Sequence, residues 1–137
     1  MKVKYIQFLF ILFILQFNGF LIQAQDDFGC DELTNKKAKK KFEKAMSLPS
    51  YEKKQSYELL IEVTELDPEF AEAWYILAEI NREKAKKSNS PFNSRKQTNL
   101  TRAHNYYLKV TETCPAFDYY YSYYFLGKYY FDKKEFV

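Results

Sequence analysis

The segments VTELDPEF at 63–70 and VTETCPAF at 110–117 decide how this chain is interpreted, because they nearly repeat each other. Each contains Val-Thr-Glu, two further residues, a proline, one residue and a phenylalanine, and the two copies start 47 positions apart. Self-similarity at a period of about 20–50 residues is the signature of proteins built from repeated structural units. The chain is therefore predicted to contain one such unit at least twice.

Composition indicates that the repeated unit is helical. The chain has only three glycines among 137 residues, which argues against the many turns of an all-β fold, and Lys, Glu, Ala and Leu are abundant helix formers. Prolines at 49, 68 and 115 divide the apolar periodicity into segments. Five helices are predicted, over 33–47, 50–66, 69–87, 94–113 and from about 118 through the tyrosines.

The helix ends carry recognisable signals. Ser50 is placed to cap the second predicted helix, and Ser94 followed by Gln97 forms a capping-box pattern at the start of the fourth. The composition of SNSPFN at 88–93 predicts a loop between the third and fourth helices.

Apolar spacing predicts which side chains face inward on the first four helices. The predicted inward residues are Ala38, Phe42, Ala45 and Met46; Tyr57, Leu60, Ile61 and Val63 or Thr64; Phe70, Ala73, Trp74, Leu77 and Ala78; and Leu100, Ala103, Tyr107 and Val110.

Two segments resemble the opening motif of the tetratricopeptide repeat, W-x2-L-G-x2-Y. Trp74-x2-Leu77-Ala78 matches its first part, with Asn81 where the tyrosine is expected, and Tyr123-x2-Leu126-Gly127-x2-Tyr130 matches it almost completely. Ala103, Tyr107 and Pro115 resemble the second-helix pattern of the same family. The upstream residues Ser56, Leu60, Val63 and Pro68 fit the second helix of an earlier, weaker unit.

The resemblance implies an all-α antiparallel helix-hairpin array, a tetratricopeptide-like α-solenoid over residues 33–137 with an incomplete last repeat. The period of 47 exceeds the family's 34 residues, and the excess lies around 86–98. Trp74 and Tyr107 are expected to meet in the middle hairpin, where Ala78 and Ala103 allow close backbone approach. The last helix should expose a face around Tyr123, Leu126 and Gly127, which predicts self-association.

The first 24 residues have the pattern of a secretory signal peptide. Lys2 and Lys4 precede the apolar run at 5–22, and Ala24 is the best cleavage position, which leaves 25–32 as a leader. The alternative is an uncleaved membrane anchor, since the run is near the minimum length for crossing a bilayer. An exported protein of the periplasm or cell envelope is expected in either case.

Charge and residue types exclude several functional classes. Cleavage after Ala24 would lower the formal charge from +3 to +1, so no global electrostatic attraction to nucleic acid is expected. The single histidine, His104, is expected to be at the surface or partly packed, and no catalytic motif, metal-ligand set or cofactor motif occurs. The chain is expected not to be an enzyme and to hold no metal or cofactor.

The two cysteines, Cys30 and Cys114, are candidates for a disulfide. An oxidising compartment and an even cysteine count permit the bridge. The two residues would lie at the same end of a helical layer but about one repeat apart, so the sequence leaves the pairing open.

Tetratricopeptide arrays present a concave surface, lined by first helices, to peptides or partner proteins. The resemblance implies a non-enzymatic interaction or scaffold module, with a protein or peptide partner bound by Glu72, Tyr75, Glu79, Arg82, Tyr121, Tyr124 and Lys128. The signal and CDELTNKKAKKKFEKA together resemble the N-terminal part of bacterial envelope proteins that continue into a propeller and an OmpA-like domain. The alternative function is a membrane-tethered structural fragment of such a protein.

Overall fold

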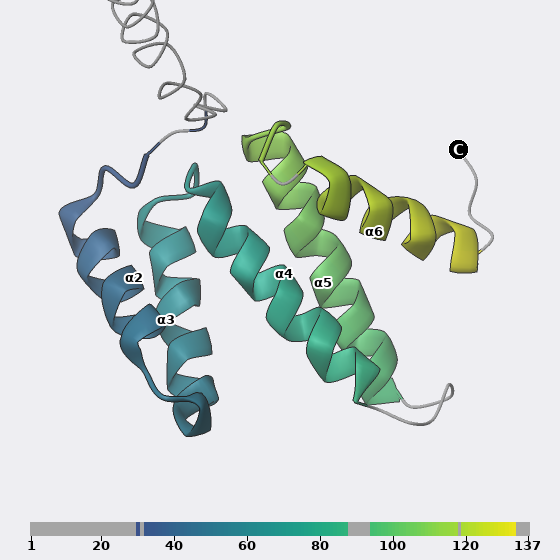
Figure 1. Cartoon of the computed structure of the whole chain (residues 1–137), viewed down its shortest axis with the longest axis horizontal. Coiled ribbons are helices and arrows are strands. Elements are labelled where there is room, and N and C mark those ends of the chain that lie inside the picture. Colours follow the sequence, from purple (N-terminus) through teal and green to yellow (C-terminus); the bar gives the residue numbers. More distant parts are fainter. Residues whose placement is uncertain (1–29, 31, 88–93, 118, 134–137) are drawn as a thin grey trace, which may run out of the picture.

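The computed structural model describes Cys30 and residues 32–87, 94–117 and 119–133, and over this part of the chain the protein is all-helical (Figure 1). The elements are α2 (Lys36–Ser47), the short 3-10 helix η1 (Ser50–Glu52), α3 (Lys53–Leu66), α4 (Ala71–Lys86), α5 (Ser94–Thr113) and α6 (Tyr119–Lys133). The all-α prediction is confirmed. The predicted signal segment 1–24 and the loop 88–93 lie outside the described residues.

The two copies of the repeated segment form the same local structure. Each valine is fully buried near the end of its helix, and its carbonyl oxygen accepts the last helical hydrogen bond, from Asp67 N at 2.9 Å and from Cys114 N at 2.8 Å. The proline that follows cannot extend the helix. Each phenylalanine N–H then closes a turn, Phe70 N to Asp67 O at 3.3 Å and Phe117 N to Cys114 O at 3.0 Å.

The threonines of the two segments are also equivalent. Thr64 Oγ1 donates to Ile61 O at 2.8 Å, and Thr111 Oγ1 donates to Leu108 O at 2.9 Å. The repeated sequence therefore specifies one way of ending a helix and turning, and it is used at the ends of α3 and α5.

The start of α2 is fixed by a cap that the sequence interpretation did not identify. The Asn35 side chain accepts hydrogen bonds from Lys37 N at 2.9 Å and Ala38 N at 3.3 Å, and its Nδ2 donates to Leu66 O at 3.0 Å. The Asp67 carboxylate accepts from the backbone N–H of Asn35 at 3.2 Å. These bonds join the beginning of α2 to the end of α3.

Of the two helices with predicted serine caps, α5 begins at the predicted residue and α3 does not. Ser50 lies in η1, and α3 begins three residues later at Lys53 without a side-chain cap. Ser94 is the first residue of α5. The 3-10 turn displaces the start of α3 because Pro49 O accepts a hydrogen bond from Glu52 N at 2.9 Å.

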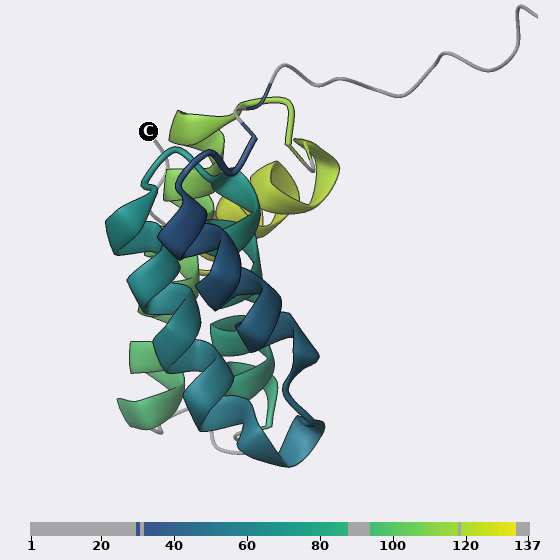
Figure 2. The same ribbon diagram turned by 90° about the vertical axis from the view of Figure 1, so that its left-hand side faces the viewer.

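Each helix packs chiefly on its neighbour in the chain, and the closest pair is α4 with α5 (Figures 1 and 2). One apolar cluster joins α2, α3 and α4 through residues such as Ala38, Leu60, Val63 and Leu77. A second cluster joins α4, α5 and α6 through Ala78, Ala103, Tyr107 and Leu126. Helix α4 contributes to both, so it connects the two halves of the molecule.

Most of the predicted inward residues are buried, but the register fails at two points. Met46 is 54% exposed, because the apolar face of α2 is made by Ala38 and Ala45. Trp74 meets Tyr106 rather than Tyr107, with ring centroids 5.8 Å apart, and its indole N–H donates to Pro68 O at 2.8 Å. The indole is half-buried because that hydrogen bond draws it toward the turn before α4.

The last helix also differs from the expectation. Leu126 is buried at 7% exposure because it packs against α5, whereas Tyr123 and Gly127 are exposed. A Cβ added at Gly127 would meet nothing within 4 Å. The glycine therefore mediates no close helix approach within the described residues.

A disulfide joins Cys30 to Cys114, with the two Cα atoms 5.4 Å apart. It attaches the chain just before α2 to the residue after α5, across a sequence separation of 84. None of the described helices is long and apolar enough to cross a membrane.

Substitution of Leu77 tests the core register. Leu77 is fully buried, so Leu77→Ala should lower the free energy of unfolding by about 2–5 kcal/mol. Met46→Ala is the matched control, because an exposed side chain away from special features contributes within about 0.5 kcal/mol. Urea unfolding measures both, and equal losses would contradict the register.

Removal of the disulfide should destabilise the domain, because the unfolded chain without the bridge has a larger conformational entropy. For a loop of this length the chain-entropy model gives a loss of about 4–5 kcal/mol for Cys30→Ser with Cys114→Ser. Urea unfolding of the double variant measures the loss. Two alkylatable thiols in the unreduced wild-type protein would show that the bridge does not form.

Candidate functional site

A groove of about 340 Å³ lies between α4, α5 and α6 and is the best candidate for a binding site. Four of the seven predicted binding residues line it, namely Arg82, Tyr121, Tyr124 and Lys128. The other lining residues are Lys86, Leu100, Tyr107 and Phe125. We call this surface the aromatic groove.

Tyr107 forms the base of the aromatic groove. Its ring is 1% exposed and packs on Phe125 of α6, with centroids 4.6 Å apart, and on Tyr75 of α4 at 6.1 Å. Its hydroxyl donates a hydrogen bond to Glu79 of α4. One side chain of α5 therefore holds both neighbouring helices.

Glu79 and Arg82 form the polar wall beside this tyrosine. Arg82 Nε donates to Glu79 Oε1 at 2.7 Å, and the second guanidinium nitrogen bonds the other carboxylate oxygen, which makes the pair bidentate. Burial alone would raise the pKa of Glu79, but the hydrogen bonds from Arg82 and Tyr107 outweigh it and lower the pKa. Burial and the bond to Glu79 raise the pKa of Tyr107 far above its ordinary value.

The cations of the aromatic groove are neutralised by acidic residues of their own helices. Glu83 contacts Arg82 at 3.1 Å and Lys86 at 3.0 Å, and Asp132 contacts Lys128 at 3.0 Å. The lysine side chains in these pairs are more than half exposed, so each pair contributes little to stability. The groove thus combines an apolar base with a polar rim of low net charge.

Two tyrosines stand at the open side of the aromatic groove. Tyr121 is 55% exposed and Tyr124 is 59% exposed, although both are large aromatic side chains. The ring of Tyr120 stacks on Tyr124 with centroids 6.0 Å apart. Exposed aromatic surface beside a formed hollow is the kind of surface that binds partners.

The other three predicted binding residues do not line the aromatic groove. Tyr75 packs between Tyr107 and Phe117, whose centroid is 5.7 Å from its own, so it is a packing residue. Glu79 is engaged by Arg82 and Tyr107. Glu72 lies on the first turn of α4, where burial raises the pKa of its carboxyl group.

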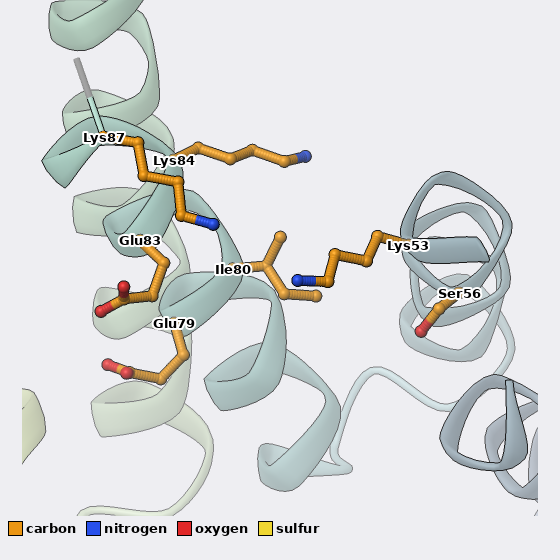
Figure 3. A pocket seen from close by; sticks show the side chains of 7 residues that line it. All are labelled: Lys53, Ser56, Glu79, Ile80, Glu83, Lys84 and Lys87. Atoms are coloured by element: carbon orange, nitrogen blue, oxygen red, sulfur yellow. The ribbon is translucent and has the colours of Figure 1, made fainter. Parts of the chain in front are cut away.

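A second hollow of about 290 Å³ lies between the start of α3 and the end of α4 (Figure 3). Its lining residues are Lys53, Ser56, Glu79, Ile80, Glu83, Lys84 and Lys87. We call it the lysine hollow. Sequence reasoning did not identify it, because Lys53 lies about 30 positions before the lysines of α4.

Buried polar contacts across the helices were also not predicted. Asn81 is 1% exposed, and its side-chain amide donates to Leu77 O at 2.8 Å and to the Tyr57 hydroxyl at 3.4 Å. The Tyr57 hydroxyl is also hydrogen-bonded to the Tyr106 hydroxyl at 3.2 Å. Asn81 lies where the tetratricopeptide motif has a tyrosine, and this difference was the one sign in the sequence that a polar side chain could be buried there.

His104 is partly packed, as expected. Its ring stacks on Tyr129 with centroids 4.3 Å apart, and its Nε2 meets the Tyr130 hydroxyl at 2.9 Å. Within the described part of the chain, no three His, Cys, Asp or Glu residues are grouped so that they could hold a metal ion.

Comparison of the chain with models of known protein families, with curated proteins and with solved structures found no match.

The pH dependence of stability tests the pair of Glu79 and Arg82 beside the aromatic groove. Because the folded-state pKa of Glu79 is lowered, its contribution is present above the carboxyl group's ordinary pKa and is lost as the pH falls through the folded value. Glu79→Gln should therefore be less stable than wild type near pH 7, and the difference should shrink as the pH is lowered from 7 through the folded-state pKa of Glu79. Urea unfolding across this range measures it.

Glu72→Gln is the matched control on the same helix, and its expected effect on stability has the opposite sign. Its folded-state pKa is raised, so the charged form opposes folding, and the substitution should be neutral or stabilising near neutral pH. If Glu79→Gln and Glu72→Gln give the same profile, Glu79 is not held by Arg82 and Tyr107.

Proposed function

We propose that this chain is a non-enzymatic protein-interaction or scaffold module of the bacterial cell envelope, which binds a partner through the aromatic groove. The observation that carries the proposal is the exposure of Tyr121 and Tyr124 over an apolar base of Tyr107 and Phe125. Tyrosines bury a large area while their hydroxyls remain hydrated, and they are enriched among the residues that dominate binding energy.

The ligand that suits this groove is an apolar or aromatic side chain presented by a partner protein or peptide. Arg82, Lys86 and Lys128 already have carboxylate partners, so the groove offers no uncompensated charge to a small ionic substrate. The rim pairs can exchange partners at low cost because they are solvated. A polar rim around an apolar centre is the usual anatomy of a protein interface.

We further propose that the helices form a tetratricopeptide-like array of antiparallel hairpins, α2 with α3 and α4 with α5, followed by α6 as the first helix of another unit. Support comes from the identical helix-ending turns after Val63 and Val110 and from the packing of each helix on the next. In such an array α4 and α6 are first helices, which are the ones expected to line a binding surface.

An exported location is part of the proposal. The basic and apolar segment at 1–24 supports it, and so does the bridge between Cys30 and Cys114, because disulfides persist in oxidising compartments. The exposed aromatic residues of α6 also make a second copy of the chain one candidate partner.

Site-specific photo-cross-linking of the full chain tests the aromatic groove. Benzoylphenylalanine in place of Tyr124 should give a discrete cross-linked product in the envelope of an exporting host, and Tyr121→Ala should reduce its yield. The same probe in place of Tyr51, which is 83% exposed on η1, is the control and should give little product.

Mass spectrometry of the product distinguishes a partner protein from a second copy of the chain. Equal yields at positions 51 and 124, or none at 124, would contradict a binding role for the aromatic groove.

A further inference from the structure

The lysine hollow concentrates positive charge that the described residues do not neutralise. Lys53 comes from the start of α3, and Lys84 and Lys87 come from the end of α4. Within the described residues none of these three ammonium groups lies within ion-pair distance of a carboxylate. Three like charges around one hollow repel each other, so a bound anion would be favoured there.

The two acidic residues that line the lysine hollow are already bound elsewhere. Glu79 accepts from Arg82 and Tyr107, and Glu83 is paired with Arg82 and Lys86. Figure 3 shows both carboxylates turned away from the ammonium groups of Lys53 and Lys84. Glu79 and Glu83 are thus held by Arg82 and Lys86, which line the aromatic groove, and Lys84 and Lys87 have no carboxylate partner among the described residues.

The centre of the hollow is apolar. Ile80 projects into it between the two helices (Figure 3), and Lys84 Nζ lies 4.3 Å from the centroid of the Tyr57 ring. A cation over an aromatic ring is held by the ring's negative face. The hollow therefore has three positive groups, of which that of Lys84 is held over a ring, around a surface that would accept an aliphatic side chain.

We propose that the lysine hollow binds an acidic segment of a partner protein, in which carboxylates meet Lys53, Lys84 and Lys87 and an aliphatic side chain covers Ile80. Charge complementarity carries the proposal, and the apolar centre favours a peptide over free phosphate. The hollow has a volume of only about 290 Å³ between two helices, so a single peptide segment fits it better than an extended anionic surface such as a bilayer. The lysine hollow is distinct from the aromatic groove, and binding of an acidic segment there does not require a ligand in the aromatic groove.

Fluorescence anisotropy with a labelled peptide, acetyl-EELEE, tests the proposal on the disulfide-bonded protein. Each of Lys53→Gln, Lys84→Gln and Lys87→Gln should weaken binding about 1.4- to fivefold, because an exposed ion pair contributes about 0.2–1 kcal/mol. The triple variant should weaken binding by about tenfold or more, and added salt should weaken wild-type binding.

The control is a second triple variant with the same change in net charge, Lys37→Gln, Lys39→Gln and Lys40→Gln, whose three lysines are exposed on α2 and lie outside the hollow. It should leave affinity within about twofold of wild type, since distant solvent-exposed charges are screened. Peptide binding should also survive Tyr121→Ala with Tyr124→Ala, which separates this proposal from the function of the aromatic groove.

Three results would overturn the proposal. One is an equal loss of affinity in the two triple variants, which would mean that net charge alone attracts the peptide. Another is no measurable peptide binding to the wild-type protein. The third is tighter, lysine-dependent binding of inorganic phosphate or of phosphatidylglycerol vesicles than of the peptide.

Discussion

The burial of Tyr107 is the interaction on which the second half of this molecule depends. Its ring fills the space between α4, α5 and α6, and its hydroxyl finds a charged acceptor in Glu79. A buried phenol without a partner would cost about 1–3 kcal/mol, so the carboxylate is needed for the tyrosine to lie there. Glu79 in turn is held by Arg82, and both Arg82 and Tyr107 line the aromatic groove.

Helix α4 separates two surfaces of different character. Along one side its cations and acids are paired beside exposed tyrosines, and along the other its lysines face the start of α3 without acidic partners in the described chain. The division follows from helical spacing: Arg82 and Lys86 are four residues apart, and so are Ile80 and Lys84. A single helix can thus present an aromatic groove and a cationic hollow at once.

The sequence allowed the helices and the ends of α3 and α5 to be predicted, because the proline of each VTE segment cannot extend a helix. The buried valine before each proline accepts the last helical hydrogen bond. Which side chains of neighbouring helices meet was harder to predict from the sequence. Tyr106 and Tyr107 are adjacent, and the indole of Trp74, which donates to Pro68 O, lies against the first of them.

Four groove residues were identified from the repeat motif because α4 and α6 do place them on a shared surface. Glu72, Tyr75 and Glu79 do not line the groove. The motif could not show this, because it gives positions along one helix and not what the opposite helix supplies. Lys53 could not be found by such a motif, since its partners in the lysine hollow are far away in the sequence.

Amide hydrogen exchange of Tyr107→Ala tests most directly whether this side chain holds α6 and the aromatic groove in place. The account predicts that amides of α6 around Leu126 and Tyr129 lose their protection, while those of α3 around Leu60 and Val63, which belong to the other apolar cluster, keep theirs. Unchanged protection of α6, or an equal loss in α3 and α6, would contradict it.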